Sequence, residues 1–180
     1  MTQTYYMCIG RKAWDKMRVD KYLSPSDLVD EDYDEFERRM DVWMMEKMRK
    51  MLPSSAFHPI EEANGSHFMF LKRTDLYSPF TDNSVVLEIN TNPDHVLYFD
   101  DNSYVQVVNS LCNGWKDTYL AFTEKEADEK KNASEADVEE SWLRMFDLTT
   151  PRDLEYTGDI ELRGMTPLIT LEMVKAYEYV

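Results

Sequence analysis

Residues 31–52 carry the most regular pattern of apolar and charged side chains in the chain. Apolar residues recur there at intervals of three, four and one, and charged residues fill the positions between them, which is typical of an α-helix with one buried face. Pro53 follows and ends the predicted helix, because proline cannot continue the backbone hydrogen bonds. Methionines suit both an irregular core and an adaptable binding groove. The apolar positions are Tyr33, Phe36, Met40, Trp43, Met44, Met48, Met51 and Leu52.

Shorter patterns predict the remaining elements. Continuous or alternating apolar runs are typical of strands, and apolar residues at helical spacing indicate helices. The predicted strands cover residues 4–9, 67–73, 84–89 and 95–99, with two or three late segments within 160–180. The predicted helices cover residues 11–19, 103–112, 124–132 and 134–146, besides 31–52.

The order of these elements favours one fold class. Strands and helices do not alternate strictly, which favours α+β over a doubly wound parallel sheet. We therefore predict a mixed, mostly antiparallel sheet with four to five helices. A chain of 180 residues has the size of one ordinary domain, and no long biased linker divides it. The prediction is a single compact domain over residues 1–180.

Two helices carry more detailed predictions. Ser134 and Asp137 have the spacing of a capping box, which predicts the start of the helix over 134–146. The segment over 103–112 is predicted to be helical, because its apolar residues recur at helical spacing. They are Val105, Val108, Leu111 and Cys112.

Two adjacent carboxylates, Asp100 and Asp101, directly precede the helix predicted to begin near Ser103. Negative side chains stabilise the positive end of a helix, by up to about 1 kcal/mol. Acid–base chemistry in a cleft is the alternative, and it would need a second titratable group nearby and a shifted pKa. The sequence leaves both interpretations open.

Charge is distributed unevenly along the chain. The net charge is −15, of which residues 1–52 contribute −1 and residues 53–180 contribute −14. Such acidity disfavours direct binding of nucleic acid or anionic membranes and favours a protein partner with a basic surface. The predicted binding surface is Glu135, Asp137, Glu139 and Glu140. A purely solvated face, or imitation of nucleic-acid phosphates, are the alternatives.

Several classes of site lack their motifs. His58, His67 and His95 have no metal-ligand spacing, so no metal is expected. No glycine-rich phosphate loop and no nucleophile elbow occurs, so no cofactor is expected from motifs alone. Cys8 and Cys112 lie in separate apolar stretches, which predicts two buried thiols, with a disulfide or a reactive thiol as the alternatives. With no export signal and no apolar run of about 20 residues, a cytoplasmic location is the prediction.

Three stretches together resemble domain-of-unknown-function family 3841, which occurs in bacteria and their phages. They are a strand pair running into a helix, "VLEINTNPDHVLYFDDNSYVQVVN" (86–109), the helical segment Ser141–Leu148, and the closing segment Met165–Val180. The Trp-His pair that the family has before its helix is missing here. Arg163 or Gly164 stands where the family has a glutamine. A site built on those family residues would be lost or changed in this chain.

The layout implied by this resemblance is distantly similar to that of ADP-ribosyltransferases, which cleave NAD with a glutamate on a late strand. Under that likeness Glu161 or Glu172 would be the catalytic glutamate. Tyr6 and Arg11 would contact the NAD cofactor. The early histidine or arginine within the first strand of those enzymes has no equivalent here.

The leading hypothesis is an acidic, cytoplasmic protein that acts by binding another protein. Its small size and charge fit an accessory role for a phage or mobile element, such as inhibition of a host or defence protein. An NAD-using transferase is the alternative from a different class. A sensor of a small ligand or nucleotide, with its cleft near Asp100 and Asp101, is the third hypothesis.

Overall fold

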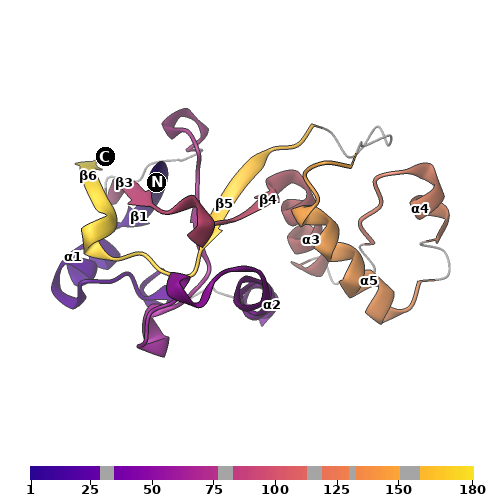
Figure 1. Ribbon diagram of the computed structural model, residues 1–180, viewed down its shortest axis with the longest axis horizontal. Coiled ribbons are helices and arrows are strands. Elements are labelled where there is room, and N and C mark those ends of the chain that lie inside the picture. The colour runs from indigo at the N-terminus through magenta and orange to yellow at the C-terminus, as the bar shows by residue number, and fades with distance from the viewer. Residues whose placement is uncertain (29–34, 77–82, 113–118, 130–132, 151–158) are drawn as a thin grey trace. The chain divides into compact units, whose positions relative to one another are not determined.

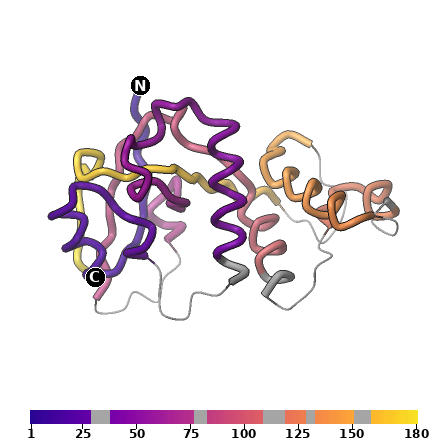
Figure 2. The backbone as a smooth tube through the Cα atoms, turned by 90° about the horizontal axis from the view of Figure 1, so that it is seen from below, coloured from indigo at the N-terminus to yellow at the C-terminus, as the bar shows by residue number. Residues whose placement is uncertain are grey.

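The computed structural model describes residues 1–28, 35–76, 83–112, 119–129, 133–150 and 159–180 (Figure 1). Within them lie five α-helices and two small antiparallel sheets of three strands each. The predicted α+β class and number of helices are therefore confirmed. The chain forms two compact units, Met1–Leu97 with Gly164–Val180, and Tyr98–Arg163. Both chain ends belong to the first unit (Figure 2).

The first unit is built on an antiparallel sheet whose middle strand is β3. Tyr5 lies opposite Ile89 on one side of β3, and Tyr177 lies opposite Leu87 on the other. Side chains alternate between the two faces of a strand, so the buried side chains of β1 share one face of the sheet. The strands, in sheet order, are β1 (Gln3–Gly10), β3 (Ser84–Thr91) and β6 (Val174–Tyr179).

Helix α1 (Arg11–Asp20) follows β1 directly and lies beside β6 in both views (Figures 1 and 2). Ala13, Trp14 and Met17 are buried, as their helical spacing predicts. The Trp14 ring packs against Tyr177 of β6 with 4.7 Å between ring centroids. The helix ends where Lys21 takes a left-handed conformation, with φ of 71°, and its backbone N–H donates to the Met17 carbonyl oxygen.

Helix α2 (Glu35–Met51) contributes four buried side chains to the first unit. They are Met40, Trp43, Met44 and Met48. Met51 was predicted on the same face, but it is 52% exposed. Met51 stands in the last turn of α2, and the apolar face of the helix extends there beyond the residues that pack against it. Tyr33 and the Phe36 side chain lie outside the described residues.

The second sheet has the order β2-β5-β4. β2 is shorter than the strand predicted over 67–73, because Phe70 leaves it and pairs with Tyr6 of β1 through hydrogen bonds of 2.8 and 2.9 Å. His67 lies opposite Thr166 in the pairing of β2 with β5. The strands are β2 (His67–Met69), β5 (Leu162–Thr166) and β4 (Leu97–Asp100).

The described residues of the second unit form the α-helices α3 (Asp101–Cys112), α4 (Glu124–Glu129) and α5 (Glu135–Ser141). Helix α5 begins with the predicted capping box of Ser134 and Asp137. In α3 Val105 is exposed, whereas Ser103 and Val107 are buried. Apolar residues occupy several sides of this helix, so the pattern alone did not fix which side faces inward. The Leu111 and Cys112 side chains lie outside the described residues.

Membrane crossing was not expected from the sequence. None of the helices in the described ranges combines the length and the apolar character that a membrane span requires.

Candidate functional site

Four carboxylates on α5 are exposed, and they are the residues predicted as the binding surface. Val138 and Ser141, on the other side of the helix, are buried. The helix is therefore anchored along one side and presents carboxylates to water on the other. We call Glu135, Asp137, Glu139 and Glu140 the acidic surface.

One member of the acidic surface also has a local structural role. The Asp137 carboxylate accepts hydrogen bonds from the Ser134 backbone N–H at 2.7 Å and from the Ser134 hydroxyl at 2.6 Å. These bonds favour the ionised form and hold the pKa of Asp137 below its usual value. The other three carboxylates make no ion pair with any described residue. Asp137 therefore starts the helix, while its neighbours are available to a partner.

The described arginines of the second unit are held in internal ion pairs. Arg144 pairs with Glu126, whose carboxylate also accepts the Phe122 backbone N–H at 2.8 Å. Arg163 pairs with Asp101 at 2.5 Å. Both arginines thus neutralise carboxylates of their own unit rather than the acidic surface.

Asp100 is fully buried and joins the start of α3 to the chain near Glu161. One carboxylate oxygen accepts the Ser103 backbone N–H at 2.9 Å and the Ser103 hydroxyl at 2.5 Å. The other oxygen accepts the Glu161 backbone N–H at 2.9 Å. These three donors belong to the protein itself, and the two from Ser103 form an N-terminal helix cap.

Asp101 is buried beside Asp100, with its backbone N–H donating to the Glu161 carbonyl oxygen at 2.8 Å. Burial raises the pKa of Asp101 to about 6, against the opposing effect of the Arg163 guanidinium; Glu161 and Asp100 raise it further. One Asp101 carboxylate oxygen has no hydrogen-bond partner within the described residues. Asp100 thus acts as a hydrogen-bonded helix cap, whereas the buried charge of Asp101 is only partly compensated.

Arg163→Met is expected to lower the free energy of unfolding by about 1.5 kcal/mol at pH 7 and to have almost no charge effect at pH 5. Without the guanidinium, Asp101 stays buried only when protonated. With Arg163 present, the pKa of Asp101 is already about 6. Protonating the Asp101 carboxylate at pH 7 therefore costs only about 1.5 kcal/mol. A carboxyl with a raised pKa contributes most stability below its unfolded pKa near 4 and loses it as the pH rises through 6.

Urea unfolding at both pH values measures this difference for Arg163→Met against the unchanged protein. In the double variant Asp101→Asn/Arg163→Met the charge is gone, so the difference between the two pH values should disappear. A deficit of Arg163→Met that is equal at pH 5 and pH 7 would contradict the assignment of a buried Asp101 charge.

The four residues predicted for an NAD-using transferase do not all lie in one unit. Tyr6 is half-buried on β1, and Arg11 stands in the first turn of α1 with its guanidinium 5.0 Å from the Tyr179 ring centroid. Glu172 is exposed in the turn before β6. Glu161 is half-buried in the second unit, where its backbone holds Asp100 and Asp101. The transferase assignment remains a prediction.

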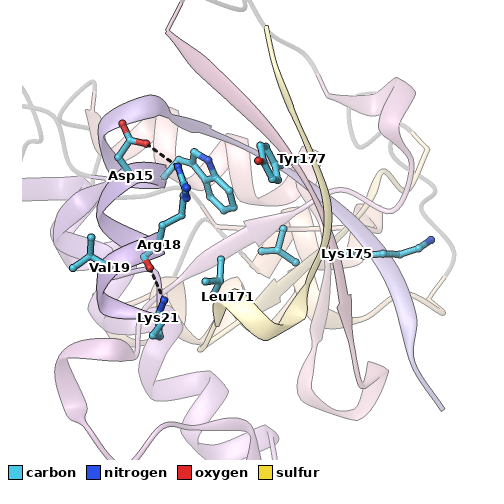
Figure 3. A pocket seen from close by; sticks show the side chains of 9 residues that line it. Asp15, Arg18, Val19, Lys21, Leu171, Lys175 and Tyr177 are labelled. Carbon is cyan, nitrogen blue, oxygen red and sulfur yellow. Dashed lines mark hydrogen bonds and ion pairs between the residues drawn. The ribbon is translucent and has the colours of Figure 1, made fainter.

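A groove in the first unit brings together residues that the sequence analysis did not select. It has a volume of about 730 Å³ and lies between α1 and the segment that leads into β6 (Figure 3). Val19 is 76% exposed and Tyr177 is 51% exposed, so both present apolar surface to water. The lining residues are Trp14, Asp15, Arg18, Val19, Lys21, Leu171, Val174, Lys175 and Tyr177.

Basic side chains from the end of α1 stand at this groove. Lys21 donates from its ammonium group to the Arg18 carbonyl oxygen at 2.8 Å, and Arg18 lies 3.8 Å from Asp15 (Figure 3). Lys175 points away from the groove in the same view and pairs with Glu88 at 2.7 Å. The groove therefore combines an apolar floor with two cations on the α1 side, in a protein whose net charge is −15.

The residues considered for thiol or metal chemistry lie apart. Cys8 is half-buried, and burial raises the pKa of its thiol. Cys112 belongs to α3, and its side chain is outside the described residues. No group of three His, Cys, Asp or Glu side chains within the described part of the chain is arranged to hold a metal ion.

Comparison with known proteins adds no relative. No protein-family model matches the chain. No curated protein and no solved structure matches it either. The resemblance to domain-of-unknown-function family 3841 therefore stays a prediction, and the functional argument rests on the residues themselves.

Proposed function

We propose that the protein acts by binding a second protein, whose basic surface docks on the acidic surface of α5. The observation that carries this proposal is the separation of charges within the second unit. Arg144 and Arg163 are committed to internal ion pairs. Glu135, Glu139 and Glu140 are exposed and have no such partner among the described residues.

The composition of this unit supports the same conclusion. Residues 98–163 hold 16 acidic and 7 basic side chains, so the acidic surface lies in a region of negative charge. A field of one sign raises the association rate of oppositely charged partners and falls steeply with added salt. The proposed binding is therefore fast at low salt and strongly salt-dependent.

The sign of the charge on the acidic surface determines the class of partner that we propose. A basic protein surface, such as one that contacts nucleic-acid phosphates, offers the matching charges. Occupying such a surface would block it, so inhibition of a host or defence protein, in a phage or mobile-element setting, is the biological role that we propose for this binding.

The triple variant Glu135→Gln/Glu139→Gln/Glu140→Gln is expected to weaken partner binding at least tenfold at physiological salt. Asp137 stays unchanged, because its hydrogen bonds with Ser134 start the helix. Charge removal should act mainly on the association rate. Quantitative pull-down from lysate, followed by kinetic measurement on the retained partner over a range of salt concentrations, gives both quantities.

A matched triple in the first unit controls for total charge. Glu46, Glu62 and Glu172 are exposed, and their replacement by glutamine changes the net charge equally. This control should keep the partner. A partner that is retained equally by both triples, or binding that does not weaken with salt, would show that the acidic surface is only a solvated face.

A further inference from the structure

The outer edge of β6 is not paired with any strand in the described residues. β6 pairs with β3 on one side only, and the Val180 backbone N–H donates to the Ser84 carbonyl oxygen at 3.1 Å. Hydrogen-bonded and non-hydrogen-bonded pairs alternate along an antiparallel ladder. Glu178, two residues before Val180, therefore directs its backbone groups toward β3. Tyr177 and Tyr179 direct their backbone N–H and carbonyl groups to the outer edge.

The groove of Figure 3 lies beside this outer edge. Tyr177 lies opposite the buried Leu87, so its side chain is on the α1 face of the sheet, where its ring meets Trp14. Val19 stands on α1 across the groove and is largely exposed. An open strand edge next to a helix-lined apolar groove is the geometry in which an extended peptide binds by adding a strand.

We propose that an extended segment of a partner protein adds as a strand to the open edge of β6 and places alternate apolar side chains in the groove. Backbone hydrogen bonds to Tyr177 and Tyr179 provide the affinity that is independent of sequence. The side chains that point toward α1 contact Val19, Val174 and Tyr177, and their alternation follows from the period of two along a strand.

The charge of the groove specifies the chemistry of the segment further. Arg18 and Asp15 are 3.8 Å apart, and both side chains are more than half exposed, so their attraction is weak. Within the described part of the chain, the Lys21 ammonium group makes one hydrogen bond, to a carbonyl oxygen, and it can donate two more. The segment therefore carries a carboxylate, aligned with Arg18 and Lys21, among its apolar residues.

A second copy of this chain fits the groove less well than a different protein. Two copies paired through β6 would bring Arg18 and Lys21 to the same seam from both sides, because both α1 helices would cover the same face of the joined sheet. Like charges at close range are unfavourable. The surface also differs from the acidic surface of α5, so the two binding activities are independent.

The test uses three fluorescent ten-residue peptides and the full chain. The first peptide alternates valine with threonine and contains two glutamates, the second has lysines in place of the glutamates, and the third is the first with alternate backbone amides methylated. Fluorescence anisotropy measures affinity, and amide hydrogen exchange measures protection at each residue. We expect the first peptide to bind at least tenfold more tightly than the other two and to slow exchange at the Tyr177 and Tyr179 amides at least tenfold.

Two valine variants separate the groove from general effects on the surface. Val19→Glu should weaken the first peptide at least tenfold, because it puts a negative charge at the groove. Val42→Glu is the matched control, since Val42 is an exposed valine on α2 and is not a lining residue. The glutamine triple on α5 should bind the peptide like the unchanged protein, so failure of this proposal and failure of the proposed function are distinguishable.

Three results would overturn the inference. Exchange at Tyr177 and Tyr179 could be unaffected by the first peptide at millimolar concentration. Val19→Glu and Val42→Glu could bind it equally. Protection of the two amides could instead rise with protein concentration in the absence of peptide, which would assign the edge to a second copy.

Discussion

Asp100→Ala is expected to lower the free energy of unfolding by about 3 kcal/mol. At this fully buried position the alanine removes the hydrogen bonds from the Ser103 backbone, the Ser103 hydroxyl and the Glu161 backbone. Loss of a helix cap costs about 1 kcal/mol, and a buried donor left without a partner costs about 1–3 kcal/mol. Urea unfolding monitored by helical circular dichroism measures the change.

Local measurements and a matched aspartate make this prediction specific. Hydrogen exchange at the Glu161 amide should accelerate in Asp100→Ala, because its acceptor is lost. Asp94→Ala is the control, since Asp94 is exposed and a surface substitution usually changes stability by less than about 0.5 kcal/mol. If Asp100→Ala costs no more than Asp94→Ala, Asp100 does not hold the two segments together in solution.

The helix-starting role of this aspartate could be predicted because it is local. Asp100 lies three residues before Ser103, and that spacing lies within one helical turn. The bond to the Glu161 backbone could not be predicted, since it joins residues 61 positions apart. One sequence contains no signal that places such distant segments side by side. The same limit applies to Arg163, which was considered only for the place of a missing glutamine and turned out to pair with Asp101.

Periodicity predicted elements well where only one side of the element was apolar. The buried face of α2 was correct from Met40 to Met48 because charged residues occupy its other side. It did not indicate which side of α3 is buried, because valines stand on more than one side of this helix and Val105 is exposed. The length of β2 was missed for a different reason, because Phe70 pairs with Tyr6 instead of continuing its own strand.

The two candidate binding surfaces differ in how far they could be predicted from the sequence. The acidic surface is a continuous charged run, so it was visible without a structure. The groove joins Val19 to Tyr177, which are far apart in the chain. Exposed apolar residues of this kind look ordinary in a sequence, because much of any protein surface is apolar. Only the pairing of β6 with β3 and the packing of α1 bring them together.

His67→Phe is expected to gain about 2 kcal/mol of stability relative to the unchanged protein when the pH falls from 7 to 5. His67 is fully buried in β2, and neither ring nitrogen has a hydrogen-bond partner within the described residues. Burial lowers the pKa of its ring from 6.5 to about 4, and the nearby Ala63 backbone offsets only part of this effect. The neutral ring therefore stabilises the fold above pH 6.5, and this contribution is lost as the pH falls toward 4.

The comparison must be a difference between two proteins, because other buried groups titrate in the opposite direction. Burial raises the pKa of Asp41 and of Asp101 to about 6, so both carboxyls add stability as the pH falls through that value. Their contributions are common to the unchanged protein and to His67→Phe, and they cancel in the difference between the two unfolding curves. NMR titration of the His67 ring gives its pKa directly. A ring that titrates near 6.5, or two unfolding profiles that stay parallel between pH 7 and pH 5, would mean that water or a carboxylate reaches His67 and that the core around β2 is open.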